Sequence, residues 1–181
     1  MTLANASRAA LGFVAHQDVR LMRRLERWRP RRWVRWWMIT ATRGGDGWMW
    51  WTQAFVLLVA GGRQRFVALA AAAIACGLGI QTFLTLKRLI GRRRPSRRDR
   101  HNWARLLPPD EFSFPSGHTI IAFAFAISVG HFYPDFLPWF LFCAISVAAS
   151  RIVLGLHFLS DVAAGCAIGC GLGHFATLLM G

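Results

Sequence analysis

The stretch Val67–Leu84 reads VALAAAAIACGLGIQTFL and contains no charged residue. A helix crosses the hydrocarbon core of a bilayer with about 20 apolar residues, and four further apolar segments accompany this one. In 181 residues, a soluble fold would have too little polar sequence to cover them. The sequence therefore predicts an all-α, polytopic membrane helical bundle with about five transmembrane helices, of which the first and third are short and have to tilt or borrow flanking residues. The candidate spans are Trp48–Ala60, Phe66–Ile90, Thr119–His131, Phe136–Leu154 and Phe158–Met180.

A basic segment precedes the first span. From Leu11 to Trp28, apolar residues recur at near-helical spacing with arginines between them. This pattern predicts an N-terminal amphipathic helix that lies in the membrane interface. Pro30 interrupts the helix, and tryptophans, which favour headgroup depth, follow it. We therefore divide the chain into an Arg- and Trp-rich interfacial segment, residues 1–46, and a transmembrane domain, residues 47–181.

The net charge of +14 indicates an anionic partner. No nucleic-acid-binding module accompanies the charge, so the expected partner is a bilayer with anionic headgroups and not a nucleic acid. The first long apolar run starts well inside the chain, which argues against an N-terminal signal or transit peptide. The four cysteines lie in apolar runs, without the spacing of a disulfide or zinc framework. Cys166 and Cys170 share a predicted helix face, typical of close packing, with Gly165, Gly169 and Gly173.

Polar residues with a common chemistry recur in the second half of the chain. Three short motifs carry them, in the order Lys87-x6-Arg94-Pro95, Pro115-Ser116-Gly117-His118 and Ser150-Arg151-x5-His157-x3-Asp161. They contain cations for phosphate oxygens, a small turn with free backbone N–H groups, and two histidines. With five spans, all three motifs fall on the same membrane face. The sequence therefore predicts that they converge at one end of the bundle.

The spacing within the motifs suggests roles for the residues. On a helix, His157 and Asp161 would lie on the same face because they are four residues apart. The carboxylate could then accept the Nδ1 proton and leave Nε2 free as a nucleophile or base. His118 comes from another segment and could act on the leaving group as a general acid. Lys87, the only lysine, and Arg94 are two helical turns apart and could point into one pocket.

From Lys87 to Asp161 the chain resembles the type 2 phosphatidic acid phosphatase family, whose relatives include the soluble vanadium-dependent haloperoxidases. The resemblance implies a hydrolase that acts on lipid phosphate esters or diphosphates, with no metal or other cofactor. His157 would attack phosphorus to form a phosphohistidine, oriented by Asp161, and His118 would protonate the leaving oxygen and then activate water. The residues that would bind phosphate are Lys87, Arg94, Ser116, Gly117 and Arg151.

Several substrates and functions are compatible with these motifs. The substrate could be undecaprenyl diphosphate, phosphatidylglycerophosphate, phosphatidate or lipid A phosphate. A vanadate-dependent haloperoxidase is an alternative enzyme, although those relatives are soluble and larger. A non-catalytic protein that binds anionic lipids is a third reading, but it leaves both histidines without a purpose. The oligomeric state has no signature in the sequence.

Two features of the sequence predict opposite orientations in the membrane. Most arginines fall on the face that carries the motifs, and the positive-inside rule would place that face in the cytoplasm. The resemblance to bacterial phosphatases places the site at the periplasmic face of the inner membrane, which we favour, because a phosphate pocket and an interfacial helix need arginines for their own reasons. The long polar loop Gly91–Phe114 is on the same face and is predicted to be functional or a partial lid.

Overall fold

The structure is a computed structural model that describes residues 3–95 and 111–181. Within these ranges the chain forms helices joined by short turns and contains no β-strand. The α-helices are α1 (Leu3–Arg27), α2 (Arg32–Gly45), α3 (Trp48–Ala60), α4 (Arg65–Ile90), α5 (Gly117–Phe132), α6 (Leu137–Val153) and α7 (Leu159–Met180), and the short 3-10 helices are η1 (Gly62–Gln64) and η4 (Pro134–Phe136). The predicted all-α membrane bundle is confirmed. Residues 96–110, most of the predicted lid loop, lie outside the described ranges, so the lid stays a prediction.

The outer surface of the bundle is apolar. The helical stretches Gly62–Ile90, Pro134–Val153 and Leu159–Met180 are long and apolar enough to cross a membrane, and α3 and α5 are shorter apolar helices. Large apolar side chains face outward on these elements, among them Trp48, Trp51, Phe66, Leu89 and Leu178. Exposing such a large apolar surface to water is unfavourable, whereas contact with lipid is favourable. The chain is an integral membrane protein.

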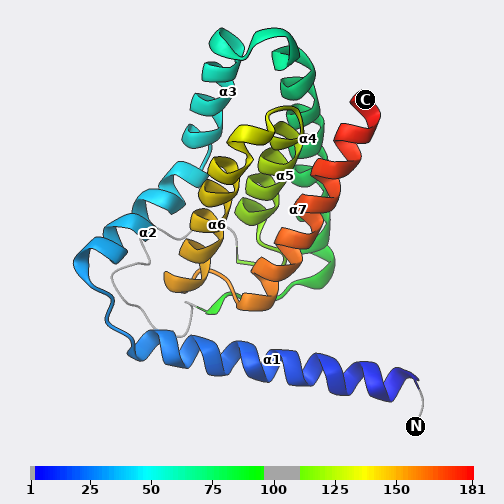
Figure 1. Ribbon diagram of the computed structural model, residues 1–181. Helices are drawn as coiled ribbons and strands as arrows, with labels where there is room; N and C mark the ends of the chain where they lie inside the picture. The colour runs from blue at the N-terminus through cyan, green and yellow to red at the C-terminus, as the bar shows by residue number, and fades with distance from the viewer. Residues whose placement is uncertain (1–2, 96–110) are drawn as a thin grey trace.

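Helix α5 is the centre of the bundle and packs against α4, α6 and α7 (Figure 1). Ile120, Ala124 and Val129 on this helix are fully buried, and so is the hydroxyl-bearing Ser128, which donates its Oγ proton to the Ala124 carbonyl at 2.7 Å. Other helices surround α5, so little of its surface contacts lipid. Its short length therefore does not have to match the thickness of the bilayer.

Helix α7 approaches α5 along its glycine face, as predicted. A Cβ atom at Gly169 would lie 2.5 Å from the Ile120 carbonyl oxygen, and one at Gly173 would lie 2.8 Å from the Ile127 Cβ. At Gly165 it would lie 2.9 Å from the Ser116 carbonyl oxygen. These distances leave no room for a side chain, so the two backbones are in direct contact.

The two ends of the bundle differ in character. At one end, the Tyr133 hydroxyl donates to the Gly61 carbonyl at 2.5 Å and joins the α3–α4 and α5–α6 turns. The C-terminus of α7 lies at this end, whereas α1 crosses the opposite end (Figure 1). The predicted break at Pro30 is confirmed, because α1 ends at Arg27 and α2 starts at Arg32. Helix α2 then packs against α6.

The glycine face generates a stability prediction. Gly169→Ala should lower the thermal midpoint in detergent by several degrees, because an added methyl group overpacks the α5–α7 contact by about 1–3 kcal/mol. Gly171→Ala is the matched control on the same helix, since nothing lies within 4 Å of its Cβ position. Equal midpoints for the two variants would contradict the close helix contact.

Candidate active site

Lys87 and Arg94 reach the site from different parts of the chain. Lys87 is in the last turn of α4, whereas Gly91 ends this helix in the left-handed conformation, with φ of 61°. Arg94 therefore lies beyond the helix, so the helical spacing on which the prediction relied does not apply, and a common pocket for the two side chains stays a prediction. Both are nevertheless buried. Arg94 Nη1 donates to the Leu156 carbonyl at 2.9 Å and lies 3.0 Å from His157 Nε2.

His157 also lies outside a helix. Helix α7 begins at Leu159 and Phe158 is its N-cap residue, so the predicted helical pairing of His157 with Asp161 is wrong in detail. The two side chains still meet, because Asp161 lies in the first turn and its Oδ2 accepts the Phe158 N–H at 2.8 Å. His157 Nδ1 is 3.7 Å from the same Oδ2, an ion-pair distance that is too long for a hydrogen bond.

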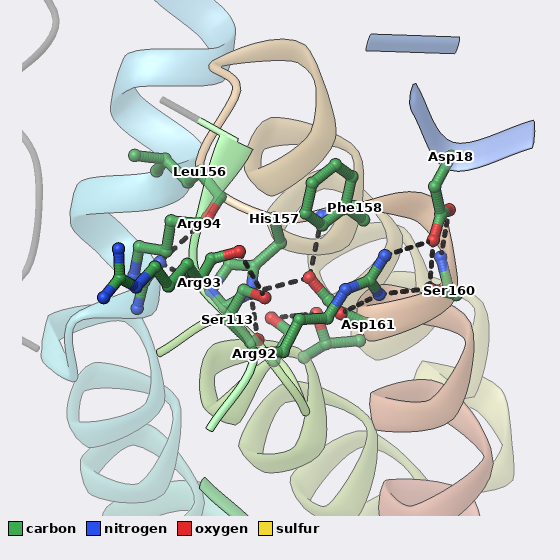
Figure 2. A network of polar contacts seen from close by, with 12 residues as sticks. Asp18, Arg92, Arg93, Arg94, Ser113, Leu156, His157, Phe158, Ser160 and Asp161 are labelled. Carbon is green, nitrogen blue, oxygen red and sulfur yellow. Dashed lines mark hydrogen bonds and ion pairs between the residues drawn. The ribbon is translucent and has the colours of Figure 1, made fainter. Parts of the chain in front are cut away.

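The hydrogen-bond partner of His157 Nδ1 is a backbone carbonyl. Nδ1 lies 2.6 Å from the Ser113 oxygen (Figure 2). A carbonyl oxygen can only accept, so the proton is on Nδ1 and the neutral ring has a lone pair on Nε2. The acceptor predicted from the sequence was the Asp161 carboxylate. Ser113 was missed because a main-chain acceptor leaves no trace in residue type.

The His157 imidazole is neutral. Its side chain is 1 % exposed, and this burial lowers its pKa to about 3, with the charges of Arg94 and Arg151 acting in the same direction and Asp161 opposing them. A lowered pKa means that the ring keeps only the Nδ1 proton and stays uncharged at neutral pH. Because the one proton of the ring is on Nδ1, the lone pair is on Nε2, which points toward the cations of the site.

The turn at Pro115–Gly117 differs from the expectation in one respect. The Ser116 N–H donates to the main-chain oxygen of Asp161 at 3.1 Å, so it is not free for phosphate. The Ser116 Oγ accepts a hydrogen bond from the Thr119 hydroxyl at 2.9 Å and keeps its own proton for another acceptor. Gly117 begins α5, where backbone N–H groups lack helical partners. A Cβ there would lie 3.1 Å from the Phe83 ring.

Two further polar residues at the site come from the end of α2. Arg151, in the last turn of α6, is buried and donates from Nη1 to the Thr42 hydroxyl at 2.6 Å. His118 Nε2 lies 2.7 Å from Asp46 Oδ1. This hydrogen bond lowers the pKa of Asp46, so the carboxylate is ionised and accepts a hydrogen bond from the Nε2–H group of His118. Arg151 also acts electrostatically on both histidines.

Thr42 and Asp46 fall in residues 1–46, the predicted interfacial segment. The predicted division of the chain stays a prediction, but this segment reaches the site through α2. The available signal was the turn Thr42–Gly47, which precedes the first span on the same face as the motifs. The three motifs converge there, as the span count predicted: Arg94 meets His157, and the Ser116 turn meets Asp161.

Curated relatives match part of the chain. A lipid A 1-phosphatase of Rhizobium etli is 36% identical over 97 residues, which are 51% of this chain and 40% of the relative. A decaprenylphosphoryl-5-phosphoribose phosphatase of Mycobacterium tuberculosis is 36% identical over 112 residues, 61% of this chain and 58% of the relative. The chain therefore spans between two fifths and three fifths of the length of these two relatives.

Two crystal structures resemble the fold as a whole. The Aquifex aeolicus LpxE structure superimposes with a TM-score of 0.69 at 23% identity, covering 88% of this chain and 94% of that one. A transmembrane PAP2-type phosphatidylglycerolphosphate phosphatase from Bacillus subtilis also has a TM-score of 0.69, at 22% identity over 92% of this chain and 85% of that one. The family model of the PAP2 superfamily matches residues 64–181, well over half of the sequence and all three motifs. The chain belongs to the PAP2 superfamily.

Proposed function

We propose that this protein is a membrane phosphatase that hydrolyses the phosphate ester or diphosphate of a lipid through a phosphohistidine. The observation that carries the proposal is the state of His157. Its Nδ1 proton is held by the Ser113 carbonyl at 2.6 Å, and its Nε2 faces the Arg94 guanidinium at 3.0 Å. A neutral imidazole whose Nε2 lone pair accepts a hydrogen bond from a phosphate-binding guanidinium can attack phosphorus once a bound phosphate takes over that hydrogen bond.

In the first half of the reaction, the His157 Nε2 lone pair forms a bond to phosphorus and the bond to the leaving oxygen breaks. His118 has to act here as an imidazolium. Burial and the charges of Arg151 and Lys87 oppose this charged form, and the Asp46 carboxylate, 2.7 Å away, favours it; the imidazolium gives the leaving oxygen its proton. The phosphorylated His157 ring carries positive charge, which Asp161, 3.7 Å from Nδ1, stabilises electrostatically. The negative charge on the equatorial oxygens is stabilised by three cations, Lys87, Arg94 and Arg151, and by Ser116 and Gly117.

In the second half, the now neutral His118 takes a proton from water. The resulting hydroxide attacks phosphorus, the bond to His157 Nε2 breaks, and inorganic phosphate leaves. The positive charge that this reaction needs comes from the three cationic side chains, so we propose that it requires no metal.

The substrate is a lipid that presents phosphate at headgroup depth. Undecaprenyl diphosphate, phosphatidylglycerophosphate, phosphatidate and lipid A phosphate all fit this description. The names of the relatives favour lipid A phosphate and add a polyprenyl-linked phosphoribose. The exposed arginines of α1, with the exposed Trp33 and Trp36 of α2, support contact with anionic headgroups.

The site faces the periplasm of a bacterial inner membrane in this proposal. Lys87, Arg94 and Arg151 are buried in the site. Their place in the site explains why they lie on this face, so the positive-inside rule is not needed to explain them. Ten of the remaining arginines of this face precede the first span, where an interfacial position explains them.

Phosphate release tests the proposed function. In detergent micelles, the wild type should release phosphate from at least one of these five lipids, and His157→Ala should lower the rate by at least about a thousandfold because it removes the attacking atom. His174→Ala, an exposed position on α7, is the matched control and should keep wild-type activity. Unchanged release by the His157 variant would overturn the assignment. Lipid binding without release from any substrate would favour the non-catalytic binder.

Metal removal provides a second test. Activity should persist in excess EDTA, because arginine and lysine supply the positive charge. Vanadate should inhibit, since its five-coordinate form resembles the transition state within the same set of cations. Loss of activity in EDTA that Mg2+ restores would point to another mechanism.

The orientation of the protein in the membrane can be measured with two variants in which an exposed glutamine is replaced by cysteine. Gln17 on α1 and Gln64 in η1 are both exposed and lie toward opposite ends of the bundle. In a variant without native cysteines, an impermeant thiol reagent applied to spheroplasts should label Gln17→Cys and spare Gln64→Cys. The reverse pattern would place the site in the cytoplasm and agree with the positive-inside rule.

A further inference from the structure

Arg92 joins two carboxylates that lie far apart in the sequence. Its Nη2 donates to Asp18 Oδ2 on α1 at 2.7 Å, and its Nη1 donates to Asp161 Oδ1 on α7 at the same distance (Figure 2). The same Nη1 also donates to the Ser160 hydroxyl at 2.7 Å. A guanidinium is planar and presents several N–H groups in fixed directions, so these contacts set its orientation.

Asp18 is buried on a helix whose described side chains are mostly exposed. Its own exposed fraction is 3 %. A buried carboxylate is costly unless it is paired, and Asp18 is paired fully. Its Oδ1 accepts the Ser160 backbone N–H at 3.1 Å, and its Oδ2 accepts the Ser160 hydroxyl and Arg92. Asp18 thereby satisfies one of the N–H groups that the start of α7 leaves without a helical partner.

Arg92 contacts the surroundings of His157 in three ways. Its guanidinium holds Asp161, and its main-chain oxygen accepts the Ser113 N–H at 2.7 Å. Asp161 and Ser113 are the two residues whose oxygen atoms lie next to His157 Nδ1. The guanidinium also lies over the Phe158 ring, with its central carbon 4.1 Å from the ring centroid.

We infer that Asp18 and Arg92 are a positioning pair for the nucleophile: Asp18 fixes the Arg92 side chain, and Arg92 fixes the two groups that orient His157. The inference rests on the proposed phosphatase reaction. Neither residue is a specified position of the three motifs, although Arg92 lies within the first, and Asp18 lies outside the stretch that matches the family model. The interfacial helix is therefore part of the catalytic geometry.

A purely anchoring role for Asp18 makes different predictions from a positioning role. An anchor would hold α1 at the bundle, and its loss would weaken stability or lipid binding. A positioning pair acts on the chemical step, so its loss should lower kcat and leave KM nearly unchanged. Its effect should also depend on Arg92.

The experiment is a double-mutant cycle on phosphate release. Asp18→Asn should lower kcat roughly tenfold with KM within about twofold, since small displacements of a nucleophile are costly. Asp18→Glu should recover part of the loss. In an Arg92→Gln background, Asp18→Asn should cause less than about a twofold further change. Asp135→Asn, at an exposed position toward the other end of the bundle, is the matched control and should behave as the wild type.

Three kinetic results would overturn the inference: an unchanged kcat in Asp18→Asn, a change in KM alone, or the same loss with and without Arg92. If Asp18→Asn does not accumulate as folded protein, Ser160→Ala replaces it in the cycle. This variant removes a hydroxyl that both members of the pair contact, and it should show a smaller loss of kcat with the same dependence on Arg92.

A spectroscopic readout separates this inference from the proposed function. In protein labelled with 15N-histidine, His157 should carry its proton on Nδ1, and Asp18→Asn should shift the signal toward a mixture of the two tautomers. His157→Ala assigns the signal. An unchanged tautomer would overturn the inference even in an inactive protein, whereas wild type without phosphate release from any lipid would overturn only the proposed function.

Discussion

The arrangement of the site depends on the Asp161 residue, whose three accepting oxygens bind three different segments. Its main-chain oxygen accepts the Ser116 N–H, Oδ2 accepts the Phe158 N–H, and Oδ1 accepts Arg92. The side chain is fully buried, so these hydrogen bonds are not exchanged for water. The turn before α5, the segment before α7 and the chain after α4 are thereby joined at one residue. His157 lies where these segments meet.

A buried carboxylate with these partners also explains why so many cations can share a small volume. Lys87, Arg94 and Arg151 are all buried near His157 or His118, and repulsion between them opposes folding. Asp161 and Asp46 offset part of that repulsion on either side of the site. Anionic phosphate would offset more, so the same charges that destabilise the protein favour its ligand.

Sequence patterns were sufficient for the parts of this fold that depend on periodicity. The five apolar segments became helices within a few residues of their expected ends, and the glycines of α7 became its contact with α5. The patterns gave wrong predictions where the chain leaves a helix, because Gly91 ends α4 before Arg94 and α7 begins only after His157. Contacts such as Asp46 with His118 or Asp18 with Arg92 join residues more than 70 positions apart, and no local spacing announces them.

The glycine contact between α5 and α7 has a consequence for how one scaffold can serve different lipids. His118 is at the start of α5 and His157 immediately precedes α7, so two helices in backbone contact hold the histidines at a nearly constant separation. In the proposed reaction, the geometry around phosphorus then does not depend on the structure of the leaving group. The α2–α3 turn is outside this rigid pair, and its Asp46 side chain is 45 % exposed. Selectivity among lipids can therefore diverge at the exposed part of this turn, as long as position 46 keeps the acceptor that binds His118.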